Sequence, residues 1–256
     1  MQLGNKVVVV TGSGNGIGEA VARRFTAEGA KVVVTDIEAD AVDRVATEMR
    51  TVGLAVDITT EDGVRAVAEL ARRTYGDIDV WFSNAGYSGP RQPGDLQDND
   101  IWQMTWQLHV MSHVYAAREV LPSMIERGAG YLLQTASNVA LSTQMDKVTY
   151  SVTKHAALAL AEWLAIHNRP KGIKVSCFCP GPMMTRMLRS NDFPDDHPVM
   201  KMALSPEAVA QVLVEGIAAE QFLILPPGVT TQSLIDKGTD YEGWITRTSQ
   251  GVAPAM

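Results

Sequence analysis

Short runs rich in valine and isoleucine alternate along the chain with longer segments whose apolar residues recur at helical spacing. Several of these runs are apolar throughout, which is typical of parallel strands covered on both faces. The sequence predicts strands at residues 6–10, 31–35, 53–56, 79–83, 131–136, 173–178 and 222–225. Strand–helix alternation indicates right-handed crossovers, so we expect an α/β fold with a doubly wound sheet of about seven parallel strands and helices on both faces.

Two long helical patterns follow the fourth and fifth predicted strands, over residues 100–127 despite Pro122 and over residues 150–168. No repeat, low-complexity stretch or interdomain linker interrupts the alternation, and 256 residues suit one large α/β domain. We therefore expect a single domain over residues 1–256. The least regular stretches are residues 186–204 and the part of the chain after Gly228.

The composition is that of an ordinary globular protein, with 46% hydrophobic and 20% charged residues. Acidic and basic residues, with a net charge of −7, are mixed along the chain without a cluster of lysine and arginine. We therefore expect neither nucleic acid nor a membrane as a partner. The first valine run is too short for a signal peptide or a membrane span, so we expect a cytoplasmic protein.

Cys177 and Cys179 are the two cysteines of the chain. We take alternate residues of a strand to point to opposite faces, so we expect these side chains to diverge without forming a disulfide. No further cysteine lies nearby and the histidines are scattered, so the sequence predicts no metal site. The two thiols are expected to be reduced and buried.

A glycine-rich segment at residues 11–18 joins the first predicted strand to a helical pattern. Gly12, Gly16 and Gly18 allow a tight turn and a close approach of the backbone to a pyrophosphate, and the helix N-terminus supplies N–H donors. Glycines are common in ordinary turns, so the loop alone is weak evidence. Its place at the first strand-to-helix junction favours a dinucleotide as the ligand.

Asp36 ends the second predicted strand, where a carboxylate can accept hydrogen bonds from the adenosine ribose of a dinucleotide. It would repel the 2′-phosphate of NADP by roughly 3 kcal/mol per unit charge at about 5 Å. The glycine loop carries Asn15 and no lysine or arginine that would neutralise such a phosphate. The sequence therefore predicts NAD(H) in preference to NADP(H), although Asp36 could also cap the helix that follows.

Two further groups follow predicted strands, and each has a structural alternative. Asp57 comes after the third strand, where it could accept a hydrogen bond from the adenine amino group or cap a helix. Residues 84–86, Asn-Ala-Gly, close the fourth strand. Small residues there either let a cofactor lie against the sheet edge or form a plain turn.

Tyr150 and Lys154 are four residues apart in a predicted helix and therefore share one face. A nearby ammonium favours the phenolate and would bring the tyrosine pKa, ordinarily near 10, toward neutrality. Such a phenol can exchange a proton with an alcohol or a carbonyl group. This spacing often arises by chance, but Ser137 ends the fifth predicted strand at the ligand-binding edge and could bond the same substrate oxygen.

Taken in chain order, these motifs resemble the short-chain dehydrogenases/reductases, in their short single-domain branch, from about residue 4 to residue 225. The resemblance rests on Thr11-Gly12-x-x-x-Gly16-x-Gly18, Asp36, Asp57, Ser83-Asn84-Ala85-Gly86, Ser137, Tyr150-x-x-x-Lys154 and Pro180-Gly181-x-x-x-Thr185. Each motif is weak by itself, but the ordered set is specific. The resemblance implies a Rossmann-like sheet and hydride transfer by a nicotinamide cofactor.

The resemblance also implies a role for each residue. Tyr150 would be the general acid/base, Ser137 would orient and polarise the substrate oxygen, and Lys154 would bind the nicotinamide ribose and lower the pKa of Tyr150. Besides Tyr150 and Lys154, the residues expected to contact the cofactor are Gly12, Asn15, Gly16, Ile17, Gly18, Asp36, Ile37, Asp57, Ile58, Asn84, Ala85 and Gly86, with Pro180, Gly181, Met183 and Thr185 at the nicotinamide end.

The sequence departs from the family pattern at three places. The family usually has an asparagine in the middle of the long fourth helix, where it helps a water molecule to link the catalytic lysine to solvent; here that position falls on His109. We hypothesise that His109 relays the proton itself, because imidazole titrates near neutrality, but it could equally be a helix residue without that role. Ser83 replaces a common asparagine, and residues 222–228 replace the usual ending. The expected homo-oligomer could therefore be a dimer or a tetramer.

Residues 186–204 resemble the mobile lid over the substrate in this family, and residues 229–256 form an atypical C-terminal tail. Methionines at positions 183, 184, 187, 200 and 202 would give the lid region a soft apolar surface, although they could instead pack the domain. Gln144, Met145 and Trp102 are further candidates for the pocket. We expect a fairly apolar small-molecule alcohol or ketone as the substrate.

The sequence thus favours an NAD(H)-dependent oxidoreductase that interconverts a secondary alcohol and a ketone. The alternative is a non-catalytic dinucleotide-binding regulator or scaffold on the same fold. Retention of Ser137, Tyr150 and Lys154 argues for the enzyme. His109 and the unusual tail are the features that would suit the alternative.

Overall fold

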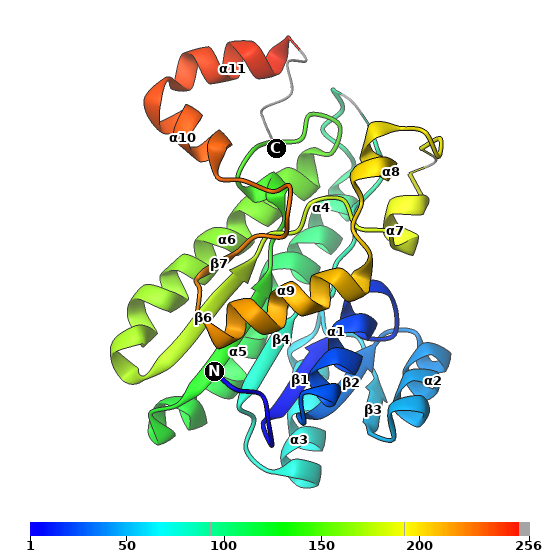
Figure 1. The fold of residues 1–256 in the computed structure, drawn as a ribbon, viewed down its shortest axis with the longest axis vertical. Coiled ribbons are helices and arrows are strands. Elements are labelled where there is room, and N and C mark those ends of the chain that lie inside the picture. Colours follow the sequence, from blue (N-terminus) through cyan, green and yellow to red (C-terminus); the bar gives the residue numbers. More distant parts are fainter. Residues whose placement is uncertain (93, 192, 251–256) are drawn as a thin grey trace.

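The structure is a computed structural model, and it describes residues 1–92, 94–191 and 193–250. Seven parallel strands form one sheet in the order β3-β2-β1-β4-β5-β6-β7 (Figure 1). The strands are β1 (Val7–Thr11), β2 (Lys31–Asp36), β3 (Val52–Ala55), β4 (Val80–Ser83), β5 (Gly130–Thr135), β6 (Ile173–Phe178) and β7 (Leu223–Ile224). The predicted doubly wound parallel sheet is confirmed, and every predicted strand end lies within one residue of the observed one.

Helices cover both faces of this sheet. They are α1 (Gly16–Ala27), α2 (Ala39–Met49), α3 (Glu61–Tyr75), α4 (Asn99–Trp106), α5 (Ser112–Arg127), α6 (Val148–Asn168), α7 (Arg186–Arg189), α8 (Pro198–Met202), α9 (Pro206–Ala218), α10 (Gln232–Thr239) and α11 (Tyr241–Ser249), with short 3₁₀ turns at Asn138–Ala140 and Arg169–Lys171. Among the described residues, no helix combines the length and the apolar character needed to cross a bilayer.

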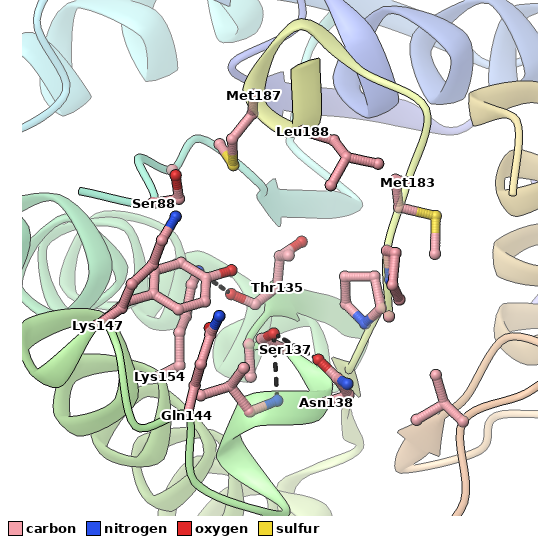
Figure 2. A pocket seen from close by; sticks show the side chains of 18 of the residues that line it. Ser88, Thr135, Ser137, Asn138, Gln144, Lys147, Lys154, Met183, Met187 and Leu188 are labelled. Atoms are coloured by element: carbon pink, nitrogen blue, oxygen red, sulfur yellow. Dashed lines mark hydrogen bonds between the residues drawn. The ribbon is translucent and has the colours of Figure 1, made fainter. Parts of the chain in front are cut away.

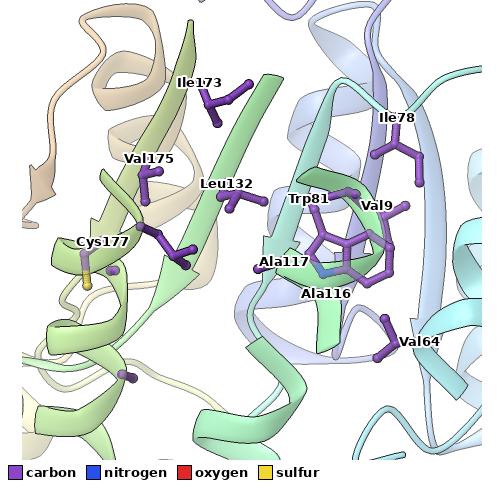
Figure 3. Close-up of a cluster of buried hydrophobic side chains, with 14 of the residues drawn as sticks. Val9, Val64, Ile78, Trp81, Ala116, Ala117, Leu132, Ile173, Val175 and Cys177 are labelled. Atoms are coloured by element: carbon purple, nitrogen blue, oxygen red, sulfur yellow. The ribbon is translucent and has the colours of Figure 1, made fainter. Parts of the chain in front are cut away.

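The apolar strands supply two large hydrophobic cores, one on each face, and Val34 of β2 forms a small third cluster with Val42 and Val45 of α2. Successive residues of a strand point to opposite faces, so Val9 of β1 joins one core while its neighbour Val8 joins the other. The first core contains Trp81 and side chains of α3, α5 and α6 (Figure 3). The second core contains Phe25 of α1 and Leu213 of α9. Burial on both faces explains why these strands are apolar throughout rather than alternating.

The strand order places a crevice at the carboxyl ends of β1 and β4. From β1 the chain builds β2 and β3 on one side, and it then returns to lay β4 on the other side of β1. The segments that leave β1 and β4 therefore diverge, and ligands of doubly wound sheets bind at such a point. The glycine loop follows β1 and residues 84–86 follow β4, so the topology brings both predicted cofactor segments to this crevice.

The long helix predicted over residues 100–127 contains a local irregularity. α4 and α5 are joined by a π-helical turn at Gln107–Met111, while Pro122 lies inside α5 without ending it. A π-helical turn holds extra backbone in one turn and often occurs at functional sites. Apolar spacing does not reveal such a turn. His109 lies in the middle of it.

Our prediction that Cys177 and Cys179 diverge is wrong. Direct neighbours of a strand point to opposite faces, whereas residues two positions apart point to the same face. The two sulfur atoms lie 3.9 Å apart, and both thiols are buried and free. The expected burial in the free form is therefore borne out, but the direction of the side chains is not.

In the segments predicted to be least regular, the described residues form four helices. α7 and α8 lie within residues 186–204, and α10 and α11 lie in the tail beyond the carboxyl edge of the sheet (Figure 1). The Asp240 carboxylate starts α11 by accepting a hydrogen bond from the Gly243 N–H at 2.9 Å. Trp244 is buried, with the Lys237 ammonium 4.4 Å from its ring centre. These local contacts order a tail that lacks a strong apolar period; its residues 251–256 lie outside the described part of the chain.

Candidate active site

A cavity of about 380 Å³ lies at the carboxyl edge of the sheet. The segments that follow β4, β5 and β6 and the first turns of α6 form its walls (Figure 2). The predicted lid and the tail complete it. Their lining residues are Met187, Leu188, Asn191, Phe193 and Val199 from the lid, and Val229, Thr230 and Ser233 from the tail.

Ser137, Tyr150 and Lys154 all line this cavity. Ser137 follows β5, and its hydroxyl donates to Asn138 Oδ1 at 3.1 Å and accepts from the Val139 N–H at 3.3 Å (Figure 2). The second of these bonds caps the short 3₁₀ turn. The hydroxyl is therefore held in one place on the cavity wall.

Lys154 projects from the second turn of α6 and is 2% exposed. Its ammonium donates to the carbonyl oxygen of Thr135 at 2.9 Å and lies 5.7 Å from the ring centre of Tyr150. Burial lowers the pKa of Lys154 to about 8, against an opposing effect of the thiols of Cys177 and Cys179. The group is thus close to the point where it can hold or release a proton near physiological pH.

The expected lowering of the Tyr150 pKa by Lys154 is not found. Burial raises the pKa of Tyr150, and a hydrogen bond with the Ser137 hydroxyl opposes that rise. The ammonium is directed at the Thr135 carbonyl rather than at the phenol, so its stabilisation of the phenolate is outweighed by the loss of solvent. The phenol form of Tyr150 is therefore favoured at neutral pH.

The glycine loop after β1 packs too closely for any side chain at two positions. Gly12 has a φ of +65°, and a Cβ there would lie 2.7 Å from Ala85 Cα; a Cβ at Gly18 would lie 2.0 Å from the Gly12 carbonyl oxygen. Asn15 occupies the N-cap of α1, but its amide donates to Glu38 Oε2 at 3.2 Å instead of capping the helix. The first N–H groups of α1 thus remain available to an anion, which fits a dinucleotide pyrophosphate.

A family model described as short chain dehydrogenase matches residues 6–195 of this chain. The chain belongs to the short-chain dehydrogenase/reductase family. Among its curated relatives, 1-deoxy-11-beta-hydroxypentalenate dehydrogenase from Streptomyces exfoliatus is 34% identical over 231 residues, which cover 88% of this chain and 84% of that protein. The predicted resemblance is therefore confirmed.

Solved structures of other short-chain dehydrogenases share this fold. A 7α-hydroxysteroid dehydrogenase complexed with NADH and 7-oxo glycochenodeoxycholic acid superposes with a TM-score of 0.80 at 29% identity, over 88% of this chain and 92% of that one. L-sorbose reductase from Gluconobacter frateurii, complexed with NADPH and L-sorbose, gives a TM-score of 0.78 at 29% identity, over 88% and 96%. The family assignment makes this chain an oxidoreductase with a Rossmann-like nucleotide-binding fold and a nicotinamide dinucleotide as its cofactor.

In this short-chain dehydrogenase, the Asp36 carboxylate is tied to the glycine loop. Its Oδ2 accepts from the Gly14 N–H at 3.0 Å, and its Oδ1 accepts from the Glu38 N–H at 3.2 Å at the start of α2. The second bond is the helix-start role that we gave as an alternative. The first keeps the carboxylate beside the loop, where the sequence predicts the adenosine ribose.

Sequence reasoning missed two arginines that approach this loop from distant parts of the chain. Arg44 of α2 donates to the Gly14 carbonyl oxygen at 2.9 Å and pairs with Glu19 at 2.8 Å. Arg186 of α7 pairs with Glu38. Each guanidinium therefore already has a carboxylate partner, and only the tertiary fold brings these charges to the loop.

The other predicted cofactor residues divide between the cavity and its surroundings. Ile37 is 70% exposed, whereas Ile58 packs into the core and the Asp57 carboxylate accepts from the Thr59 N–H at 2.9 Å. Contacts of these three with a cofactor stay predictions. The residues of this set that line the cavity are Ile17, Asn84, Gly86, Pro180, Gly181, Met183 and Thr185.

His109 is buried beside Tyr150, with the two ring centres 5.6 Å apart. Its Nε2 accepts from the Tyr87 N–H at 3.1 Å, and its Nδ1 bonds Thr153 Oγ1 at 2.8 Å. Burial, with smaller effects of Lys154 and His113, holds the pKa of His109 well below its ordinary value. A proton relay through His109 would therefore use a neutral ring, and the hydrogen bonds of its two nitrogens with Tyr87 and Thr153 would have to rearrange. The relay stays a prediction.

Sequence reasoning also missed Lys147, which lines the cavity and is 4% exposed. Its signal was its place three residues before Tyr150, which puts it at the N-terminus of the same helix. Gln144 lines the cavity as considered, whereas Met145 and Trp102 are not among its lining residues. Of the five methionines considered for the lid region, Met183 and Met187 line the cavity, and Met200 is buried without lining it.

Proposed function

We propose that this chain is an NAD(H)-dependent oxidoreductase that interconverts a secondary alcohol and a ketone on a fairly apolar small molecule. The observation that carries the proposal is the convergence of Ser137, Tyr150 and Lys154 on one cavity next to the glycine loop. A non-catalytic dinucleotide-binding protein would have no need for this set.

Each of the three side chains has a distinct task in the proposed reaction. The Tyr150 phenol gives a proton to the substrate oxygen during ketone reduction and takes it back during alcohol oxidation. The Ser137 hydroxyl turns its proton from Asn138 Oδ1 to the same substrate oxygen and donates a hydrogen bond to it. Lys154 holds the nicotinamide ribose and keeps a positive charge below the phenol. A bound NAD(H) supplies the hydride transfer itself.

The protonation of Tyr150 sets an expected pH dependence. Because burial raises its pKa, the phenol is the proton donor that ketone reduction requires at neutral pH. Alcohol oxidation requires the phenolate, whose population grows as the pH rises. The rate of oxidation should therefore increase toward alkaline pH while the rate of reduction falls.

The apolar part of the cavity supports an apolar alcohol or ketone. Its apolar lining includes Leu141, Met183, Met187, Leu188 and Val199. Relatives named for a hydroxypentalenate and a 7α-hydroxysteroid agree with such a substrate. We therefore place the reacting carbon near Ser137 and Tyr150 and the apolar body against the lid segment.

The carboxylates at the end of β2 support NAD(H) over NADP(H). Asp36 and Glu38 both lie beside the glycine loop, and Arg44 and Arg186 are already paired with carboxylates. A 2′-phosphate would add about two negative charges there, and neither Arg44 nor Arg186, the two cations described beside the loop, is free to receive them. NADP(H) binding would require at least one of these ion pairs to break.

Cofactor binding and turnover can be tested separately. NAD+ at about 100 times its Kd should add about 2.7 kcal/mol to the stability, a Tm rise of several degrees, and NADP+ should add less. Secondary alcohols would then be screened by the absorbance of the reduced nicotinamide. Tyr150→Phe should bind NAD+ and lose turnover, with Tyr115→Phe on α5 as the matched control outside the cavity. A larger shift with NADP+ would contradict the cofactor preference, and undiminished turnover of Tyr150→Phe would contradict the mechanism.

We also propose that the chain forms a homo-oligomer. α6 exposes large apolar side chains away from the cavity, with Val152 43%, Trp163 54% and Ile166 72% exposed. Such a row on one helix suits contact with another copy. Light scattering on the purified protein would distinguish a dimer from a tetramer, and a monomer would contradict the proposal.

A further inference from the structure

The cavity described above has an excess of positive charge. Three basic side chains line it, Arg91, Lys147 and Lys154, and no aspartate or glutamate is among its described lining residues. A purely apolar alcohol would give such a cavity no partner for its charges. The basic lining therefore indicates that the substrate carries a negatively charged group in addition to its apolar body.

Two of the three cations already have a proposed catalytic role or a carboxylate partner. Lys154 donates to the Thr135 carbonyl oxygen and serves the proposed proton transfer. Arg91 pairs with the Asp146 carboxylate at 2.5 Å, and its guanidinium lies 4.6 Å from the ring centre of Phe193. Neither cation is free to neutralise a negatively charged substrate.

Lys147 is the third of these cations, and its described hydrogen-bond partner is a neutral amide oxygen. It is 4% exposed, and its ammonium donates to the neutral Asn191 Oδ1 at 2.7 Å; in the described part of the chain it forms no ion pair with a carboxylate. The carboxylate of the neighbouring Asp146 forms its ion pair with Arg91. Burying an ammonium that contacts no carboxylate destabilises the folded protein. Burial accordingly lowers the pKa of Lys147, and the nearby Asp146 carboxylate opposes this fall only in part. An anion bound in the cavity would offset this cost.

The position of Lys147 fits recognition of one end of a substrate. It starts α6, three residues before Tyr150, and Figure 2 shows its side chain on the same side of the pocket as Ser88. Asn191, its partner, belongs to the segment after α7. A group bound there would lie between the start of α6 and the lid segment, while the proposed reacting oxygen would lie near Ser137.

We infer that Lys147 binds a carboxylate of the substrate, so that the substrate is an apolar hydroxy acid or keto acid. A single ammonium that pairs with no carboxylate in the described part of the chain matches the single charge of a carboxylate better than a phosphate ester, which carries nearly two charges at neutral pH. The inference rests on the proposed function for the reacting group, but it concerns a different end of the same molecule.

A matched pair of variants separates charge recognition from a structural role. Lys147→Met removes the charge and the bond to Asn191, whereas Lys147→Gln keeps a donor for Asn191 and removes only the charge. Lys201→Met, an exposed position of α8 that does not line the cavity, is the control. The probes are 4-hydroxycyclohexanecarboxylate and cholate, each compared with its methyl ester.

With NAD+ present, we expect wild type to prefer each acid to its ester. Both Lys147 variants should lower kcat/KM for the acids by roughly 10- to 100-fold, mainly through KM, the factor that corresponds to one charged hydrogen bond. The esters should change by less than about twofold, and Lys201→Met should match wild type. Equal losses for acid and ester, or full rescue by Lys147→Gln, would show that Lys147 only holds Asn191 and would overturn the inference.

A binding measurement keeps this test independent of turnover. Calorimetric titration of the NADH-bound protein with each acid and ester gives Kd values without any reaction. If no alcohol is oxidised but the acids still bind more tightly than the esters in a Lys147-dependent way, the proposed reaction fails and the inference stands. If neither acid binds wild type more tightly than its ester, the inference fails whatever the turnover.

Discussion

At the scale of single residues, Lys154 shows how a buried charge opposes stability. Its pKa falls from the ordinary 10.5 to about 8, which corresponds to roughly 3 kcal/mol of destabilisation. The unfolded chain binds more protons than the folded one between these two values, so the cost is complete below pH 8 and disappears as the pH rises toward 10.5.

We therefore expect Lys154→Met to abolish turnover and to raise Tm by several degrees at pH 7, although the lost bond to Thr135 reduces the gain. The gain should be smaller at pH 9.5, where wild type has released most of this proton. Calorimetry at the two pH values, with Lys201→Met as the control, measures both effects. An unchanged or lower Tm at pH 7 would show that burial of the ammonium has no such cost.

Lys154 still carries its charge at neutral pH, whereas burial keeps the imidazole ring of His109 neutral because its pKa is held well below the ordinary value. If it relays protons, His109→Ala should lower kcat across pH 6–9, and His109→Asn, which installs the residue usual in the family, should restore much of it. Because the pKa of His109 is held well below 6.5, no inflection of wild-type kcat near pH 6.5 should come from this ring. Full kcat for His109→Ala over that range would eliminate the relay.

At the scale of elements, the turn between β1 and α1 depends on a backbone that side chains cannot enter. Gly12→Ala combines a positive φ with a contact of 2.7 Å to Ala85 Cα, so we expect it to destabilise the protein by about 1–3 kcal/mol and to weaken NAD+ binding. Urea unfolding and calorimetric titration would measure both.

Gly238→Ala is the matched control. Gly238 lies in α10, and an added Cβ there meets no atom within 4 Å. Alanine is favoured over glycine inside a helix, so this variant should be neutral or slightly stabilising. Equal effects of the two substitutions would show that the tight packing around Gly12 does not matter.

At the scale of the whole molecule, the cavity is completed by segments that are distant in sequence. Val229, Thr230 and Ser233 belong to the tail, and the Lys237 ammonium of α10 donates to the Ser142 carbonyl oxygen at 3.1 Å. The tail therefore supports one wall of the cavity. The glycine loop, where the cofactor is expected to bind, lies in a different part of the chain, at residues 11–18.

Removal of residues 232–256 should leave NAD+ affinity intact and raise the substrate KM roughly tenfold, because the cavity loses the lining residue Ser233 and the Lys237 bond that supports its wall. Titration with NAD+ and steady-state kinetics would separate the two quantities, and removal of residues 251–256 alone is the control. A loss of NAD+ binding would indicate that the tail supports the whole fold rather than the cavity wall.

The sequence alone was sufficient to predict the sheet and the three residues that the fold brings together in the cavity, which we propose as the reacting centre. Strands such as residues 173–178 are apolar on both faces because helices cover both faces, and this pattern can be read without a structure. Ser137, Tyr150 and Lys154 were found because their spacing and order along the chain carry the family resemblance. Parallel strands then bring their carboxyl ends to one edge, which made the position of the site predictable.

Only the tertiary structure decided which charges are neutralised and which side chains share a wall. The pairing of Arg186 with Glu38, the pKa of Tyr150 and the ion-pair partners around Lys147 depend on distances between segments far apart in the chain. Burial and charge act through space rather than along the sequence, so periodicity and motif spacing do not contain them. The sequence determined a member of the short-chain dehydrogenase/reductase family and the residues of its proposed reacting centre, and the fold decided the charge of the cavity that they line.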